Sequence, residues 1–144
     1  MRWWGLVAVL VVSAGCASQA EPAARHFQSP GADVTVTDSD NAGRVQLRVG
    51  QVLDIVLSDD YETTHCQWHD LQGYKWEVLR PLGQQYEPHT MPPEGSGGTS
   101  TSRYRATGAG TVQVRLSEED NAYPPRVARQ FSIVVDVTTD SINS

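Results

Sequence analysis

Apolar and polar residues alternate with a period of two in several short runs along the chain. The alternation is cleanest over 111–116, where three aliphatic residues occupy every second position. The run at 99–106 alternates in a similar way, and a glycine-rich turn at 108–110 separates the two runs. Such alternation is typical of β-strands that bury one face. We therefore expect a half-buried hairpin over 99–116.

The same alternation predicts the other strands of the domain. They are expected at 34–36, 44–49, 52–57, 74–78 and 130–137. In the run at 74–78, Trp76 would be the core tryptophan of a central strand. No segment has apolar residues at helical spacing over enough positions to predict a helix instead. Gly, Pro and Asp mark the turns between the predicted strands. About seven short strands with one apolar face predict an all-β, immunoglobulin-like antiparallel β-sandwich.

Three polar stretches separate the predicted strands. We expect a polar and aromatic loop over 58–72 and an acidic, Pro-rich loop over 117–128. The stretch at 80–94 carries four prolines and predicts an irregular edge segment, because proline cannot donate to a central strand ladder.

The first residues are typical of a secretion signal. Arg2 precedes an apolar run from Trp3 to Val12, too short for a comfortable permanent span, and small residues then lead to Cys16. A cysteine directly after Ala-Gly is typical of a bacterial lipoprotein signal, and the alternative is a plain signal with an incidental cysteine. We expect residues 1–15 to be removed and Cys16 to be lipidated. Ala17, in place of aspartate, favours the outer membrane, facing the periplasm or the cell surface.

The rest of the chain is long enough for one domain. Residues 16–32, rich in Ala, Ser, Pro and Gln, predict a lipidated cysteine and a flexible tether. The β-sandwich is expected over 33–138, and 139–144 would be a short tail.

The charge balance limits the partners of the mature chain. Arg2 is one of 11 basic residues, so its removal leaves 10 basic against 17 acidic side chains, a net charge of −7. This balance argues against nucleic acid and against an anionic-lipid-binding face. With Cys16 lipidated, Cys66 is the single remaining cysteine, so no intramolecular disulfide can form.

One loop carries side chains that bind metals in other proteins. His65, Cys66 and His69, with Glu62 or Asp70, would suit copper or zinc, although no second cluster supplies a further ligand. The alternative is a polar loop whose cysteine and tryptophan pack over the end of the sandwich.

Catalytic motifs are missing from the sequence. It contains no Gly-x-Ser-x-Gly and no phosphate-binding loop, and no arrangement of paired carboxylates stands out. Cys66 with a nearby histidine lacks an orienting third group. We expect a protein that is not an enzyme and uses no cofactor.

Several segments between about Val45 and Val137 form a specific pattern, above all Gly73-Tyr74-Lys75-Trp76-Glu77 and Gly95-Ser96-Gly97-Gly98-Thr99. These segments, in order, resemble the chagasin family of tight-binding inhibitors of papain-like cysteine peptidases. The resemblance implies a β-sandwich that inserts a wedge of three loops into the active-site cleft of a peptidase. Such inhibition needs no nucleophile and no metal.

The resemblance assigns peptidase-binding residues to each loop. Thr63, Thr64, Gly73 and Tyr74 stand for the first motif, Asn-Pro-Thr-Thr-Gly-Tyr, although Tyr61-Glu62 replaces Asn-Pro and His65–Gln72 intervenes. The second motif is intact as Gly95, Ser96, Gly97 and Gly98. The third loop lacks Arg-Pro-Trp and offers Tyr123 and Pro124 instead. Thr64 would approach the catalytic thiol, and Tyr123 or Trp68 would be aromatic anchors.

The altered loops leave two functions open. The intact second loop favours a lipoprotein that inhibits cysteine peptidases, whereas the altered first and third loops favour a non-inhibitory interaction or scaffold lipoprotein. Inhibition requires that all three loops lie at the same end of the sandwich.

Overall fold

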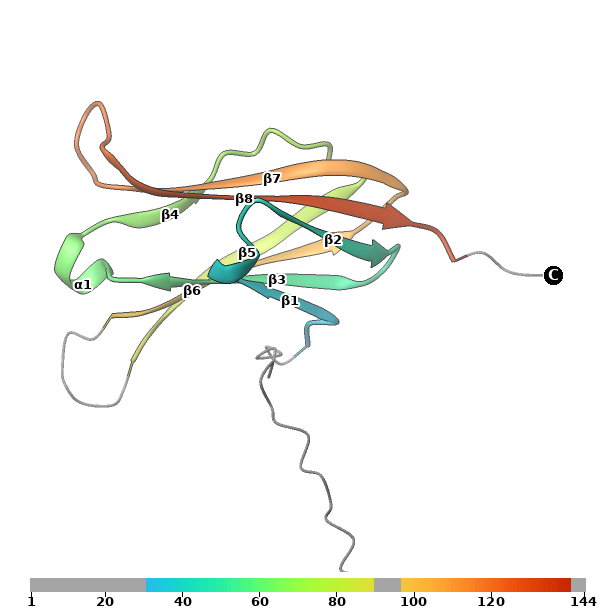
Figure 1. The fold of residues 1–144 in the computed structure, drawn as a ribbon, viewed down its shortest axis with the longest axis horizontal. Helices are drawn as coiled ribbons and strands as arrows, with labels where there is room; N and C mark the ends of the chain where they lie inside the picture. The colour runs from blue at the N-terminus through green and yellow to red at the C-terminus, as the bar shows by residue number, and fades with distance from the viewer. Residues whose placement is uncertain (1–30, 90–96, 141–144) are drawn as a thin grey trace, which may run out of the picture.

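The computed structural model describes residues 31–89 and 97–140, which form a two-layered β-sandwich (Figure 1). The elements are β1 (Val34–Thr37), the 3-10 turn η1 (Asp38–Asp40), β2 (Gly43–Arg48), β3 (Val52–Asp59), α1 (Tyr61–Thr64), β4 (Gln67–Asp70), β5 (Leu79–Pro88), β6 (Gly98–Ala106), β7 (Gly110–Glu119) and β8 (Val127–Thr138). The predicted all-β sandwich is confirmed. No helix in the described part of the chain is long and apolar enough to cross a membrane.

Some predictions lie outside the described residues. These are the signal at 1–15, the lipidated Cys16 with most of its tether, Gly95 and Ser96 of the second loop, and the end of the tail.

The strands are ordered β1-β3-β6-β5 in sheet A and β2-β8-β7-β4 in sheet B. Adjacent strands are antiparallel except at one edge of each sheet, where β1 runs parallel to β3 and β2 runs parallel to β8. The sandwich is therefore not fully antiparallel as predicted. The reason is that the chain crosses between the sheets at each step from β1 to β3, so that β1 and β3 point the same way.

The predicted hairpin over 99–116 is wrong, although both of its strands exist. β6 pairs with β3 and β5 in sheet A, whereas β7 pairs with β4 and β8 in sheet B. The turn at 107–109 thus crosses from one sheet to the other. Period-two alternation reports which face of a strand is buried and not which strand is its partner, and β6 and β7 face one core from opposite sides.

The core between the sheets contains most of the predicted inward residues. Its fully buried members include Leu53, Ile55, Val114 and Val135, none with measurable exposure. Val49 closes the strand expected at 44–49 but is 39% exposed, because it follows the end of β2.

The tryptophan in the core is Trp68 and not Trp76. Trp76 is 49% exposed, in a turn where the amides of Val78 and Leu79 donate to the carbonyl of Lys75, and 74–78 is not a strand. Trp68 is 4% exposed and lies on β4, in the stretch that was expected to be a loop. A four-residue strand with one apolar residue gives too short a pattern for period-two analysis.

The proline-rich stretch contains a regular strand. β5 has ten residues and lies at the edge of sheet A, as its prolines require, with one irregularity in its pairing between Pro81 and Gly83. Only the edge position was predicted correctly.

Two connections and the described ends of a third lie at one end of the sandwich, at the left of Figure 1 where α1 lies. We call residues 60–66 the first loop, 89–97 the second loop and 120–126 the third loop, and this end the loop end. Strand pairing places them together, because Gly98 pairs with both Asp59 and Pro88 in sheet A. In sheet B, Glu119 pairs with Gln67 and Val127.

Candidate functional site

The first loop is held as a single helical turn. The amide of Thr64 donates to the carbonyl of Asp60 at 2.9 Å, and the hydroxyls of Thr63 and Thr64 donate to the same oxygen at 3.1 and 3.0 Å. The Thr64 hydroxyl also accepts a bond from the Cys66 amide at 3.2 Å. Both threonines are exposed. The predicted pair of threonines therefore lies on a turn that is held by hydrogen bonds from both its backbone and its side chains.

An aromatic cluster lies under this turn. The ring of Tyr61 makes edge contacts with His65 and with Tyr86, each at 6.0 Å between centroids. Tyr86 belongs to β5, near the start of the second loop. These contacts join the first loop to the strand that leads into the second.

The described end of the second loop approaches the first loop closely. Gly97 has a positive φ of 81°, and a Cβ built on it would overlap the Asp60 carboxylate and lie 2.9 Å from the Asp59 carbonyl. A Cβ on Gly98 would overlap the Glu87 carbonyl. The two glycines are thus required by backbone conformation and by close approach.

The third loop is closed by one aspartate. Asp120 Oδ1 accepts the amides of Ala122 and Arg126 at 3.1 and 2.8 Å, and its Oδ2 accepts Arg126 Nε at 2.8 Å. These bonds hold the pKa of Asp120 below its ordinary value. The sequence predicted an acidic, Pro-rich loop here but not this closed turn, although an Asp-Asn sequence before prolines is a known turn signal.

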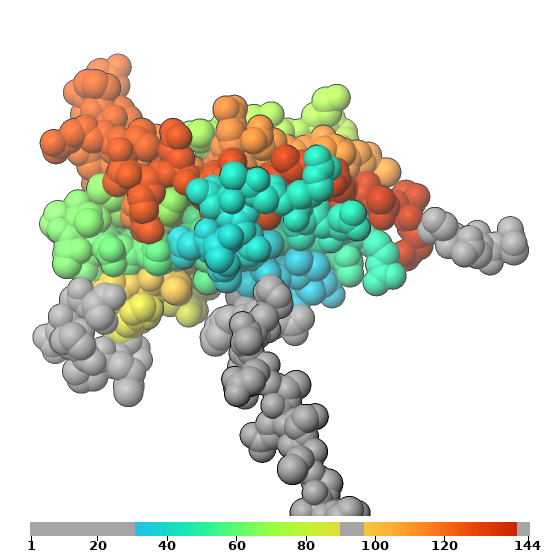
Figure 2. Space-filling view, viewed as in Figure 1, coloured from blue at the N-terminus to red at the C-terminus, as the bar shows by residue number. Residues whose placement is uncertain are grey.

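Tyr123 is the middle residue of the third loop, which projects from the surface in Figure 2. It is fully exposed, at 101%, and the bond to Pro124 is cis. An aromatic side chain with this exposure at a protruding position suits an interface anchor.

Carboxylates dominate the loop end. They are Asp59, Asp60, Glu62, Glu118, Glu119 and Asp120, against Arg126 and Arg129. Asp59 is 2% exposed, and this burial raises its pKa, opposed in part by the bond from the Tyr61 amide at 2.9 Å. Electrostatics therefore favours a partner whose facing surface is positively charged.

Gly73 and Tyr74 do not lie with the loops. They line a hollow together with Val78 and Gly110, toward the end of the sandwich opposite the loop end. The Tyr74 hydroxyl donates to Asp70 Oδ2 at 2.6 Å, and Tyr104 donates to the same oxygen at 2.8 Å. Burial and the Asp70 carboxylate raise the pKa of both phenols, which keeps them protonated as donors. Tyr74 thus has a structural role in a buried network.

The metal-binding candidates do not gather around a common point. His65 and His69 are exposed, whereas Cys66 is buried and its thiol donates to the Thr64 carbonyl at 3.7 Å. Among the described residues, no group of three His, Cys, Asp or Glu side chains is placed to hold a metal ion.

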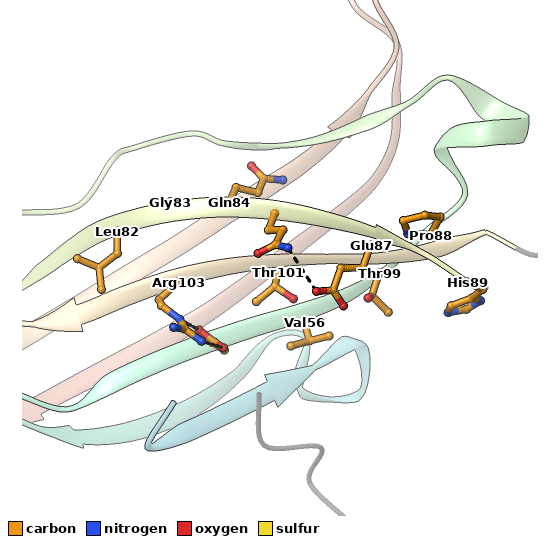
Figure 3. A pocket seen from close by; sticks show the side chains of 12 residues that line it. Val56, Leu82, Gly83, Gln84, Glu87, Pro88, His89, Thr99, Thr101 and Arg103 are labelled. Atoms are coloured by element: carbon orange, nitrogen blue, oxygen red, sulfur yellow. Dashed lines mark hydrogen bonds and ion pairs between the residues drawn. The ribbon is translucent and has the colours of Figure 1, made fainter. Parts of the chain in front are cut away.

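A shallow groove of about 840 Å³ crosses the outer face of sheet A. It extends from Arg103, paired with the buried Asp54 at 2.8 Å, past Thr101 and Thr99 to His89 (Figure 3). The groove lies on a face of the sheet and meets the loop end at His89, the first residue of the second loop.

This arrangement is that of a two-sheet β-sandwich with connections gathered at one end. The family model of the chagasin family peptidase inhibitors, I42, matches residues 46–135. Since the match covers more than half of the chain, the protein belongs to the chagasin family.

Solved structures show the same fold. The solution structure of amebosin aligns with a TM-score of 0.56 at 20% identity, over 73% of this chain and 97% of amebosin. The crystal structure of the cysteine protease inhibitor EhICP2 from Entamoeba histolytica aligns with a TM-score of 0.58 at 11% identity, over 75% of this chain and 100% of EhICP2. A search of curated proteins gave no match.

Proposed function

We propose that this protein inhibits papain-like cysteine peptidases by inserting the three loops into the active-site cleft. One observation carries the proposal: the first and third loops and the described ends of the second loop lie at one end of the sandwich in a member of a family of peptidase inhibitors. The EhICP2 fold, from a cysteine protease inhibitor, is consistent with this function.

The loops supply complementary parts of a wedge. The helical turn of α1 presents Thr64 on a bonded backbone and offers no extended peptide for cleavage. Gly97 allows the backbone to approach an enzyme wall closely, and Tyr123 provides an anchor. A stable complex of this kind buries on the order of 1,600 Å² in total.

A version of the protein comprising residues 17–144 is expected to inhibit papain at nanomolar concentration. Tyr123→Ala should weaken inhibition about 30-fold, the effect of losing an interface anchor worth about 2 kcal/mol. Gln113→Ala, on the exposed face of β7, is the control and should change nothing. The measurement is a titration of peptidase activity. An absence of inhibition at micromolar concentration would overturn the proposal and favour a non-inhibitory interaction lipoprotein.

We further propose that a lipid on Cys16 anchors the protein in the outer membrane. The described chain enters the sandwich opposite the loop end, where the Asp33 amide donates to the Val52 carbonyl at 2.9 Å. An anchor on the preceding segment would therefore be attached to the sandwich away from the loops. Labelled palmitate should be incorporated by the full chain in bacteria and lost in Cys16→Ala, and label that persists in the variant would contradict the anchor.

A further inference from the structure

One arginine at the base of the third loop holds a buried carboxylate. Arg129 is the cross-strand partner of Glu118, and its Nε and Nη2 donate to the two carboxylate oxygens at 2.6 and 3.1 Å. The Glu118 side chain is only 4% exposed. A bidentate hydrogen-bonded ion pair of this kind fixes the orientation of the guanidinium as well as its position.

The same guanidinium reaches across to sheet A. Its Nη1 donates to Ser58 Oγ at 2.9 Å and its Nη2 to the Ser58 carbonyl at 2.7 Å. The indole nitrogen of Trp68 donates to that carbonyl too, at 3.0 Å, and the guanidinium lies 5.2 Å from the centre of the Trp68 ring. Arg129 therefore contacts both sheets and an aromatic face.

The contacts of Arg129 flank two loops. Ser58 and Trp68 lie just before and after the first loop, while Glu118 and Arg129 lie just before and after the third. Their separation in the chain hides this relation from sequence analysis, since Ser58 and Arg129 are 71 positions apart. Arg129 itself follows the third loop, and its side chain contacts residues beside the other three ends of the two loops.

The charges around Arg129 would repel one another without it. Glu118 and Asp59 are both buried, at 3% and 2% exposure, and Glu118 contributes to the raised pKa of Asp59 whereas Arg129 opposes it. Asp38 lies 3.9 Å from the guanidinium. Loss of the cation leaves a buried carboxylate unpaired, which drives local rearrangement or water entry.

We propose that Arg129 is a positioning residue that sets the spacing of the first and third loops so that they enter a peptidase cleft together. This inference rests on the proposed function. Loops that are already ordered lose less conformational freedom on binding, so Arg129 contributes to affinity without touching the peptidase.

The test compares three changes at this position with a control. Arg129→Met keeps the aliphatic stem, and Arg129→Lys keeps the charge but not the planar fork. The double variant Arg129→Met with Glu118→Gln removes the unpaired carboxylate as well. Arg44→Met is the control, because it breaks the ion pair of Arg44 with Asp136 far from the loop end, where Asp136 pairs with Thr111 near the start of β7.

Three quantities are measured on each variant of residues 17–144: the association and dissociation rates with papain, the thermal midpoint, and amide hydrogen exchange without peptidase. We expect Arg129→Met to raise the dissociation rate and the inhibition constant about tenfold or more. The amides of Thr64 and His65, bonded inside the first loop, should exchange faster while strand amides stay protected. The double variant should recover the midpoint but not the affinity, and Arg44→Met should change neither the affinity nor the loop exchange.

Either of two results would overturn the inference. One is an Arg129→Met protein with wild-type affinity and wild-type exchange in the first loop. The other is full recovery of affinity in the double variant, which would assign the loss to stability alone. If Arg129→Met does not fold, Arg129→Lys and the double variant decide by the same criteria. If the wild-type protein does not inhibit papain, the proposed function fails, and the loop exchange still decides whether Arg129 orders the loops.

Discussion

Replacing Gly98 with alanine is expected to remove most of the inhibition. Gly98 begins β6 between two neighbouring strands, and a Cβ there would overlap the Glu87 carbonyl and lie 2.9 Å from both Pro88 Cα and Tyr86 Cε2. Backbone on both sides prevents easy relaxation, so the start of β6 must move. Inhibition should weaken about 30-fold or more, corresponding to ~2 kcal/mol, because the base of the second loop is displaced from the first.

The control for this variant is Gly73→Ala. Gly73 was predicted from the family resemblance to bind the peptidase, yet it lies away from the loop end, and a Cβ there would meet only the flexible side chain of Arg115 at 3.4 Å. We expect its inhibition constant to be unchanged, as measured by titration against papain. Gly98→Ala should also lower the free energy of unfolding by about 1–3 kcal/mol, from the overpacked contact. Equal loss of inhibition in both variants would contradict the assignment of the loop end as the binding surface.

Trp68→Ala is expected to destabilise the fold by about 3–5 kcal/mol. The side chain is 4% exposed in the core, its indole nitrogen bonds to the Ser58 carbonyl, and its ring lies against Arg129. Trp76→Ala is the matched control, since that ring is 49% exposed, and it should change stability by no more than about 0.5 kcal/mol.

Urea denaturation followed by circular dichroism measures both free energies of unfolding. The order expected from sequence alone was the reverse, with Trp76 in the core of a strand. A larger loss for Trp76→Ala than for Trp68→Ala would therefore support the sequence-based interpretation against the structure.

The strands that could be predicted are the longer ones with a single buried face. β7 and β8 each alternate over enough residues to give a clear period, and their inward residues belong to the core. β4 has four residues and could not be separated from a loop by its pattern. β5 was missed because its prolines are compatible with an edge strand as well as with irregular chain.

The residues of the candidate site, too, could be predicted only in part from the sequence. Family motifs pointed to Thr63, Thr64, Gly97 and Gly98, and the structure brings these residues to one end together with Tyr123, while their binding role stays a prediction. The motif could not show that Gly73 and Tyr74 lie elsewhere, because the stretch that separates them from Thr64 includes β4.

The sequence by itself determined the fold class, the family and the apolar face of most strands, because period-two alternation and local motifs depend on residues close together in the chain. Only the tertiary structure decided which strands share a sheet, which tryptophan is buried and which side chains support the loops. Those features depend on contacts between distant residues, as between Arg129 and Ser58. A pattern of burial specifies that a side chain faces a core, but the partner it meets there is set by how the two sheets pack.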